Sequence, residues 1–195
     1  MPIISGNRSA RRLGALLVVL SLCLAARPAN SPWATTRLDA TASVDMPYAG
    51  TEESAEEDFL QVKRFFTSTS DNDFEVWRFA LADGAKTKQG QDQTLVFDMD
   101  KYLRRYLALT RKKFSKAKLQ SEHPVTVPSA PGALGFHRVY YGFDEFKQEP
   151  AVLELTWVTR GDVVYLFNCS NLLPEEDGAR EDKQHFFTTI HFDTQ

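Results

Sequence analysis

The sequence has few residues of the kinds that most often carry chemistry. Its 195 residues include only two cysteines and four histidines. Cys23 lies in an apolar N-terminal run, which leaves Cys169 as the one thiol of the rest of the chain. A single thiol cannot form an internal disulfide, so the fold must be held by its hydrophobic core. Because Cys169 follows an apolar strand-like run, we expect a buried and unreactive side chain there.

The sequence patterns of common active sites are also missing. There is no Gly-x-Ser-x-Gly, His-Glu-x-x-His, Walker or Rossmann glycine pattern. His185 and His191 are six residues apart on a predicted helix, about 600° of rotation, so they would face away from each other. A zinc site needs an i, i+4 pair or a Cys/His cluster. We therefore predict no metal, no cofactor and no catalytic residue, and interpret the four histidines as structural or surface residues.

The chain has no strong excess of either charge, and its net charge is −3. This value argues against nucleic acid as a partner, because domains that bind nucleic acid are usually basic. Aromatic residues are plentiful, with 14 Phe, 6 Tyr and 3 Trp. They predict an aromatic core, and a pocket for a hydrophobic ligand is the alternative use of so many rings.

Residues 1–26 have the pattern of a secretory signal peptide. Arg8, Arg11 and Arg12 form a positive start, and the uncharged run Leu13–Ala26 follows. Small residues at its end, before Arg27, mark a cleavage region. A spanning helix needs about 20 apolar residues, so this shorter run favours a removed signal over a membrane anchor. We predict an exported protein, secreted or periplasmic.

Two other export signals are possible for the same segment. Residues 20–23 resemble a bacterial lipoprotein box, in which Cys23 would be lipidated and become the mature N-terminus, although Leu22 stands where that box has a small residue. Arg11 and Arg12 resemble a twin-arginine signal, but the residues that follow fit it poorly. Plain secretion or periplasmic release is the preferred interpretation.

The remaining chain divides into a linker and one domain. Residues 27–42 are rich in Ala, Pro, Ser and Thr and predict a flexible linker. Residues 43–195 have the length of a single domain. The acidic residues within 49–58 predict a solvated loop or a short helix start, since their spacing fits no hard-cation loop.

The hydrophobic pattern predicts an α+β fold, an antiparallel β-sheet with two main helices packed on it. Apolar and β-branched runs predict seven strands, and helical spacing predicts a helix from about residue 98 to 118 and another over 175–190. The predicted strands are 43–47, 59–67, 74–81, 119–127, 134–141, 151–159 and 163–168. The order is β-β-β-α-β-β-β-β-α, which indicates helices on an antiparallel sheet.

Three segments make this order similar to the Mog1/PsbP-like fold. Residues 43–47 resemble its opening strand, F-x-V-x-x-P, and residues 132–141 resemble its later G-x-x-x-x-x-x-x-Y strand. Residues 186–192 resemble its closing F-x-x-I-x-x-S-F phrase, with His191 where serine is usual. The fold occurs in small accessory proteins of photosystem II, in a Ran-binding factor and in exported bacterial proteins. The resemblance implies a binding or accessory module and no common reaction.

One surface feature stands apart from the rest of the sequence. Eight Lys and Arg residues, without an acid among them, lie between positions 101 and 118: Lys101, Arg104, Arg105, Arg111, Lys112, Lys113, Lys116 and Lys118. Such a run is either a solvated face or a patch that docks on an anionic protein or membrane surface.

These observations together predict an exported, non-catalytic binding or accessory module whose partner is a protein or a membrane surface. The alternatives are a small exported hydrolase that uses a carboxylate or Cys169, and a carrier of a hydrophobic ligand.

Overall fold

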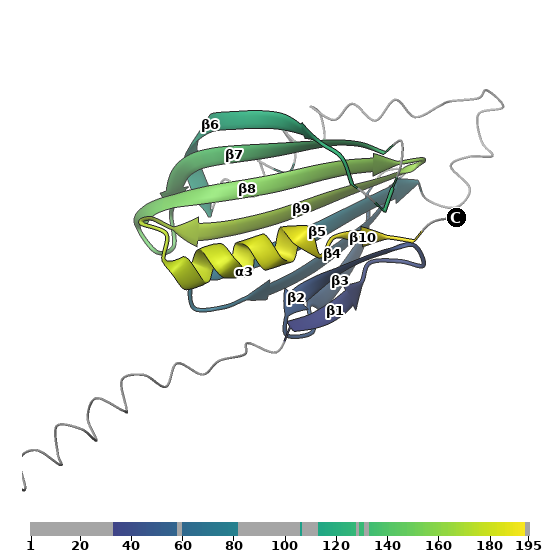
Figure 1. Ribbon diagram of the computed structural model, residues 1–195, viewed down its shortest axis with the longest axis horizontal. Helices are drawn as coiled ribbons and strands as arrows, with labels where there is room; N and C mark the ends of the chain where they lie inside the picture. The colour runs from purple at the N-terminus through teal and green to yellow at the C-terminus, as the bar shows by residue number, and fades with distance from the viewer. Residues whose placement is uncertain are drawn as a thin grey trace, which may run out of the picture. The chain divides into compact units, whose positions relative to one another are not determined.

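The protein is described by a computed structural model over residues 33–57, 60–81, 106, 113–127, 129–130 and 133–193 (Figure 1). The predicted signal peptide, with Cys23, lies outside these residues. So does the predicted first helix up to residue 112, apart from Tyr106, whose backbone is helical. Among the described residues, no helix is both long and apolar enough to cross a membrane.

The largest element is a seven-stranded antiparallel sheet in the order β3-β4-β5-β9-β8-β7-β6. Its strands are β3 (Thr51–Glu57), β4 (Leu60–Ser68), β5 (Asn72–Leu81), β6 (Phe114–Val125), β7 (Leu134–Asp144), β8 (Glu149–Arg160) and β9 (Val163–Leu172). Five of the predicted strands are present here with small shifts of their ends. A tight turn joins β8 and β9, with Gly161 in the left-handed conformation at φ 56°.

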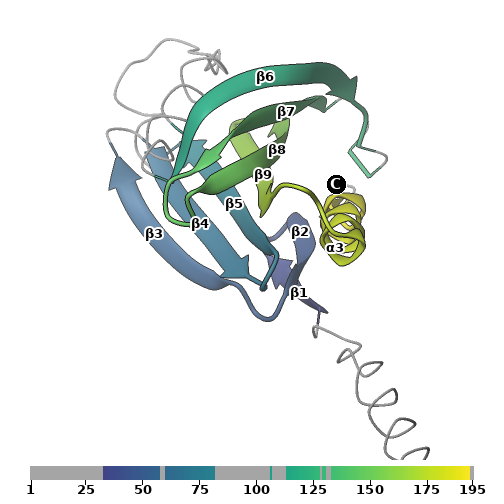
Figure 2. The ribbon, with the colours of Figure 1, turned by 90° about the vertical axis from the view of Figure 1, so that its left-hand side faces the viewer.

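A second, three-stranded sheet has the order β1-β2-β10 and lies beside the single helix of the described chain. Its strands are β1 (Trp33–Arg37), β2 (Ala42–Pro47) and β10 (His191–Phe192), and the helix is α3 (Asp177–Thr188). Figure 2 shows α3 next to β2 and β9, on the opposite side from β3. The strand pair β10–β2 closes this sheet and joins the two ends of the domain.

The central strands bury side chains on both of their faces. In β9, Tyr165 and Phe167 belong to a first core, whereas Val164 and Leu166 belong to a second core. Neighbouring residues of a strand point to opposite sides of a sheet, so the continuous apolar run of β9 supplies both cores at once. β8 does the same, with Val158 in the first core and Leu153 and Leu155 in the second.

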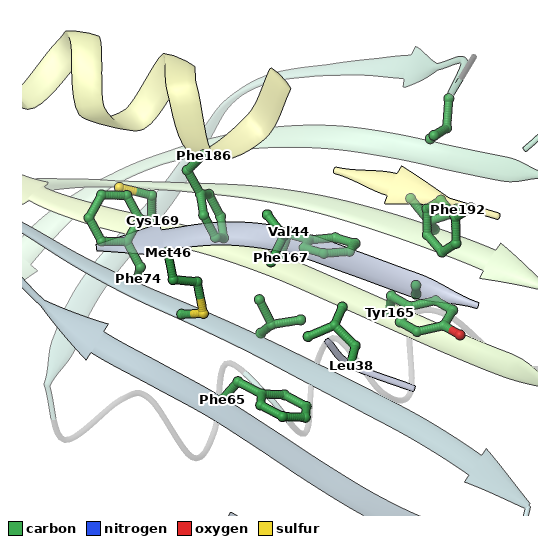
Figure 3. Close-up of a cluster of buried hydrophobic side chains, with 14 of the residues drawn as sticks. Leu38, Val44, Met46, Phe65, Phe74, Tyr165, Phe167, Cys169, Phe186 and Phe192 are labelled. Atoms are coloured by element: carbon green, nitrogen blue, oxygen red, sulfur yellow. The ribbon is translucent and has the colours of Figure 1, made fainter. Parts of the chain in front are cut away.

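The first core lies between the seven-stranded sheet, α3 and the small sheet. Figure 3 shows Phe186 of α3 directed toward Phe74 and Cys169 of the large sheet, with Val44 of β2 alongside. The ring centroids of Phe186 and Phe74 are 5.1 Å apart. The helix is thus held by one fully buried aromatic side chain and the residues around it, as its predicted apolar side requires.

Four predictions about local structure are corrected. The predicted linker is wrong from Trp33 onward, because β1 pairs with β2 over five residues. The acidic run forms strand β3 rather than a loop or a helix start, and Lys63 and Arg64 of β4 pair with its Glu52 and Glu53. Residues 114–118, expected in the first helix, belong to β6. Only one of the two expected helices has its bounds among the described residues.

Asp39, in the turn between β1 and β2, ties the small sheet to the large one. Its carboxylate accepts hydrogen bonds from Nε of Arg78 on β5 and from the hydroxyl of Tyr165 on β9, both at 2.6 Å. It also accepts hydrogen bonds from the backbone N–H groups of Thr41 and Ala42. Burial raises the pKa of Asp39, but these hydrogen bonds outweigh it and lower the pKa to about 2. The same contact and burial raise the pKa of Tyr165 to about 12.

The depressed pKa makes Asp39 a pH-dependent source of stability. The carboxylate stabilises the folded state fully above its ordinary value of 3.8, and that contribution disappears as the pH falls toward 2. We expect Asp39→Asn to lower the free energy of unfolding by about 2 kcal/mol at pH 7, from the pKa difference. Urea unfolding of both proteins between pH 7 and 2 measures this difference, which should shrink below pH 4.

Asp193→Asn is the matched control, because Asp193 pairs with Arg37 on the exposed surface. Its effect should be much smaller. A difference between wild type and Asp39→Asn that stays constant down to pH 2 would contradict the role given to the Asp39 carboxylate.

Candidate functional site

The predicted basic surface is only partly covered by the described residues. Lys101, Arg104, Arg105, Arg111 and Lys112 lie outside them. Lys113 precedes β6, and its Nζ lies 2.7 Å from Oδ2 of Asp73. Lys116 is on β6, with its Nζ 4.9 Å from the ring centroid of Phe143. Lys118 is also on β6 and is exposed. The three described members therefore have different surroundings, and the patch as a whole stays a prediction.

Cys169 is enclosed in the first core, as expected. Its exposed fraction is 0%, and its Sγ lies 3.7 Å from Oδ1 of Asn72. Burial raises the pKa of the thiol well above its ordinary value, so the nucleophilic thiolate is disfavoured. A hydrolase mechanism that uses Cys169 has no accessible nucleophile.

One group of side chains resembles a catalytic triad, with a hydroxyl on Thr156, a base on His137 and a carboxylate on Glu154. Nδ1 of His137 lies 2.9 Å from Oγ1 of Thr156, and its Nε2 lies 3.4 Å from Oε2 of Glu154. However, Thr156 is 4% exposed. A substrate cannot reach a hydroxyl that is enclosed in this way. We conclude that these contacts orient side chains within the fold.

Lys183 of α3 completes this polar cluster. Its Nζ lies 2.5 Å from Oε1 of Glu154 and 2.5 Å from Oε1 of Glu175. Burial lowers the pKa of Lys183, but its two carboxylate partners outweigh that effect and raise it. Burial likewise raises the pKa of Glu154, and His137 and Lys183 reverse the effect and lower it. The positive charge of Lys183 is thus balanced by carboxylates, and its contact with Glu154 attaches the helix to β8.

Removing the ammonium group from this cluster takes away the nearest cation of Glu154 and Glu175, and leaves Glu175 with Nε of Arg180 at 3.6 Å. We expect Lys183→Met to lower the free energy of unfolding by about 3 kcal/mol at pH 7. Part of this loss should be recovered near pH 4, as Glu154, without the ammonium group that lowers its pKa, becomes protonated. Chemical denaturation at the two pH values measures it.

Arg180→Met is the control, because Arg180 of the same helix is exposed and pairs with Asp177 at 3.0 Å and, at a longer 3.6 Å, with Glu175 of the cluster. It should change stability by less than about 1 kcal/mol. Equal losses for the two variants would contradict the role given to Lys183.

The described residues contain no group of three or more His, Cys, Asp or Glu side chains that could hold a metal ion. His185 lies against Trp33, with 4.3 Å between ring centroids, and its Nε2 is 3.4 Å from Oδ2 of Asp45. His191 is in β10 rather than on the helix of His185, so the expectation of a shared helix was wrong.

A pocket of about 390 Å³ opens on the second-core side of the large sheet, over β4, β5 and β9. It lies beside the start of β6 and the turn between β7 and β8. Its lining comprises Arg64, Phe66, Thr67, Ser68, Asp73, Phe74, Glu75, Trp77, Tyr106, Lys113, Phe114, Phe146, Leu153, Asn168 and Ser170. This volume is at the lower end of the range for small-ligand pockets.

The strand register builds the floor of the pocket. Phe66 of β4 lies opposite Glu75 of β5, which lies opposite Asn168 of β9. One step along the sheet, Ser68, Asp73 and Ser170 form a second row. Residues directly opposite on neighbouring strands share a face, so six residues from three strands converge here.

The charged groups of the pocket are paired with one another. Arg64 forms an ion pair through Nε with Glu75, and through its Nη1 with Glu53 at 3.1 Å. Lys113 pairs with Asp73, which also accepts the hydroxyl of Ser68 at 2.6 Å. Burial raises the pKa of Asp73, but the hydrogen bonds from Lys113 and Ser68 outweigh it and lower the pKa. The pocket therefore has ionic groups but little net charge.

Aromatic rings form much of the wall. The guanidinium carbon of Arg64 lies 4.4 Å from the ring centroid of Phe66 and 5.5 Å from that of Trp77. Trp77 also makes an edge-on contact with Tyr106, at 6.1 Å between centroids. The Nε1–H of Trp77 is buried and has no hydrogen-bond partner in the described part of the chain. A buried donor without an acceptor is costly and calls for a structural or functional reason.

Phe114 and Phe146 complete the wall at the open side. Phe146 is 75% exposed, the most exposed large apolar side chain among the described residues. Phe114 is buried, and its ring lies over Gly142 of β7. A Cβ atom at Gly142 would stand 2.6 Å from both the Phe114 ring and the carbonyl oxygen of Ser115. Glycine at this position is what lets Phe114 lie flat beneath the pocket.

This pocket was not predicted from the sequence. Its charged residues alternate with apolar ones as in an ordinary strand, and Tyr106 lies in the segment predicted as a helix. One signal was available: Glu75 and Arg64 alternate with core residues on strands that bury both faces, where a charge needs a nearby partner.

A side chain at Gly142 should disturb the packing of Phe114, which lines the pocket. We expect Gly142→Ala to lower the free energy of unfolding by about 1–3 kcal/mol through overpacking against Phe114. Urea unfolding measures the loss. In Gly50→Ala the new Cβ would meet mainly the flexible side chain of Met46, at 3.1 Å, so this control should lose less. An equal or larger loss at Gly50 would contradict the packing given for Phe114.

Comparison with known proteins identifies the fold. No protein-family model matches the chain, and no curated protein matches it. Among solved structures, the cyanobacterial PsbP (CyanoP) of Synechocystis sp. PCC 6803 superposes with a TM-score of 0.52 at 8% identity, covering 85% of this chain and 95% of that one. The protein of unknown function PA94 from Pseudomonas aeruginosa matches over 78% of this chain and 94% of its own, at 16% identity and a TM-score of 0.38.

The likeness to CyanoP concerns the fold alone, given the low identity. It agrees with the fold family that the sequence resembled, and the described chain has the mostly antiparallel sheets with one helix given above. The chain therefore has a Mog1/PsbP-like fold.

Proposed function

We propose that this protein is an exported, non-catalytic binding module and that the pocket over β4, β5 and β9 is its binding site. The observation that carries the proposal is the pocket itself, where aromatic rings surround ion-paired side chains. Concave sites with mostly apolar walls and a few placed polar groups are typical of binding sites.

The other groups that suggested chemistry support binding over catalysis. Cys169 and Thr156 are enclosed, and Glu154 is held by Lys183. In the pocket, Asp73 and Glu75 are each held by a cation, which makes them poor general bases. A carboxylate whose pKa is lowered by a partner is also a poor general acid at neutral pH.

The location of the pocket links it to the predicted basic surface. Lys113 lines the pocket and is the described residue nearest in sequence to Arg111 and Lys112. An anionic protein or membrane surface that bound the predicted patch would therefore act close to the pocket. Export by residues 1–26, with lipidation at Cys23 as the alternative, remains part of the proposal.

A photo-crosslinking experiment tests the binding site in the full chain, expressed in the cells that naturally produce the protein. p-Benzoylphenylalanine replaces Phe146 at the rim of the pocket, or Leu119 as the control. Leu119 is on β6, is 51% exposed and does not line the pocket. We expect a defined adduct from position 146, lost when Trp77→Ala is added, and none from position 119.

Intact mass spectrometry of the products measures the outcome and the processing together. The mass of the adduct separates a small molecule from a protein, and the mature N-terminus shows whether residues 1–26 are removed and Cys23 carries lipid. No adduct at position 146, or equal adducts at both positions, would contradict the proposed site. An esterase, phosphatase or glycosidase activity lost in Cys169→Ala would instead favour the hydrolase.

A further inference from the structure

Strand β3 forms one edge of the large sheet, and its outer side pairs with no strand of the described chain (Figure 2). It pairs with β4 over all seven of its residues, from Thr51 to Glu57, without a shift of register. Residues 51–55 are all exposed. An edge strand presents unpaired backbone N–H and C=O groups to any strand that can approach it. β3 is therefore a regular and accessible edge, seven residues long.

The opposite edge of the same sheet is protected against such pairing. β6 has two irregularities of register within residues 115–121, and Lys116 has a positive φ of 54°. Pro124, near its end, has no backbone N–H to donate. Bulges, lysines and prolines are the means by which exposed edges are kept from adding strands. β3 has no lysine, no proline and no shift of register, so the two edges differ in kind.

The side chains of β3 determine the charge of a strand that can pair with it. The strand has four glutamates and no basic residue. Two of them pair with the cations of β4 described above, whereas Glu56 and Glu57 lie opposite the uncharged Gln61 and Leu60. Opposite charges on neighbouring strands stabilise a sheet, and like charges destabilise it. The acidic excess of this edge therefore favours a basic strand.

A second copy of this chain fits the edge poorly. If two copies of β3 paired antiparallel about Ser54, the glutamates at positions 52 and 56 of the two copies would face each other. β6 of a second copy carries lysines, but its bulges would break the regular register of β3. Both arrangements are unfavourable, so the strand that suits this edge comes from a different protein.

We propose that the outer edge of β3 is a docking site for another protein, which adds an extended segment rich in Lys or Arg to the sheet, antiparallel to β3. Backbone hydrogen bonds give the affinity, and ion pairs with the glutamates set the register. This inference does not depend on the pocket proposed above as a binding site, because no residue of β3 lines that pocket.

Two synthetic peptides test the proposal. Lys-Lys-Val-Thr-Lys-Lys-Val, paired antiparallel to β3 from Glu57 to Thr51, places a lysine opposite each of the four glutamates. The second peptide has the same side chains and charge, but its backbone amides are N-methylated and cannot donate hydrogen bonds. Each is titrated into the ¹⁵N-labelled full chain and followed by NMR. We expect only the first peptide to shift the amide signals of residues 51–55 and to slow their hydrogen exchange, with an affinity that falls as salt is added.

Glu52→Gln tests the contribution of charge without altering the pocket, because Glu52 pairs with Lys63, which does not line it. We expect this variant to bind the first peptide about threefold more weakly, the size of one exposed ion pair. Glu122→Gln is the matched control, since Glu122 also pairs with a cation of the neighbouring strand, Arg138, but lies on the other edge of the sheet. It should leave the affinity unchanged.

The outcomes decide this inference separately from the proposed function. Equal binding of the two peptides would overturn it, because charge alone would then explain the contact. Equal weakening by the two variants, shifts confined to residues outside β3, or no binding of the first peptide would overturn it as well. A dimer of the free protein that forms through β3, detected by sedimentation and the same amide signals, would show that a second copy occupies the edge. None of these results bears on the crosslink expected from position 146.

Discussion

The need to bury both faces of the central strands governs this fold. β5, β8 and β9 carry apolar residues on both sides, so each side needs a cover. Phe186 of α3 and the small sheet cover the first side, and Asp39 fastens that small sheet to β5 and β9. The second side carries the pocket. The elements that look peripheral, β1 and β10 among them, are therefore required by the apolar pattern of the middle of the sheet.

The same constraint explains why the polar groups inside the domain are paired. A charge near either core must be compensated, and Lys183 with Glu154, and Arg64 with Glu75, meet that need. A carboxylate held in an ion pair is a poor acid or base, so the groups here that resemble a catalytic site act as structural contacts. The pocket combines aromatic walls with ion-paired side chains, and this combination favours binding, rather than chemistry, as its function.

The sequence predicted the strands whose buried residues form a recognisable hydrophobic pattern. Strands β4, β5 and β7 to β9 follow apolar, β-branched and aromatic runs, and Gly161 marks their tight turn. Strands β3 and β10 were not predicted, because neither has a run of apolar residues. β3 is acidic and forms ion pairs with Lys63 and Arg64 of β4, and β10 has only two residues. Lys116 and Lys118 were placed on a helix because charge does not distinguish an exposed edge strand from a helix end. The pocket depends on the cross-strand register of Phe66, Glu75 and Asn168, which no local pattern encodes.

The account depends on whether the pocket over β4, β5 and β9 holds a ligand. A crystal structure of the photo-crosslinked adduct at position 146 tests this most directly. We expect the captured molecule to lie in the pocket, against Phe66 and Trp77. An adduct that lies outside the pocket would contradict the account.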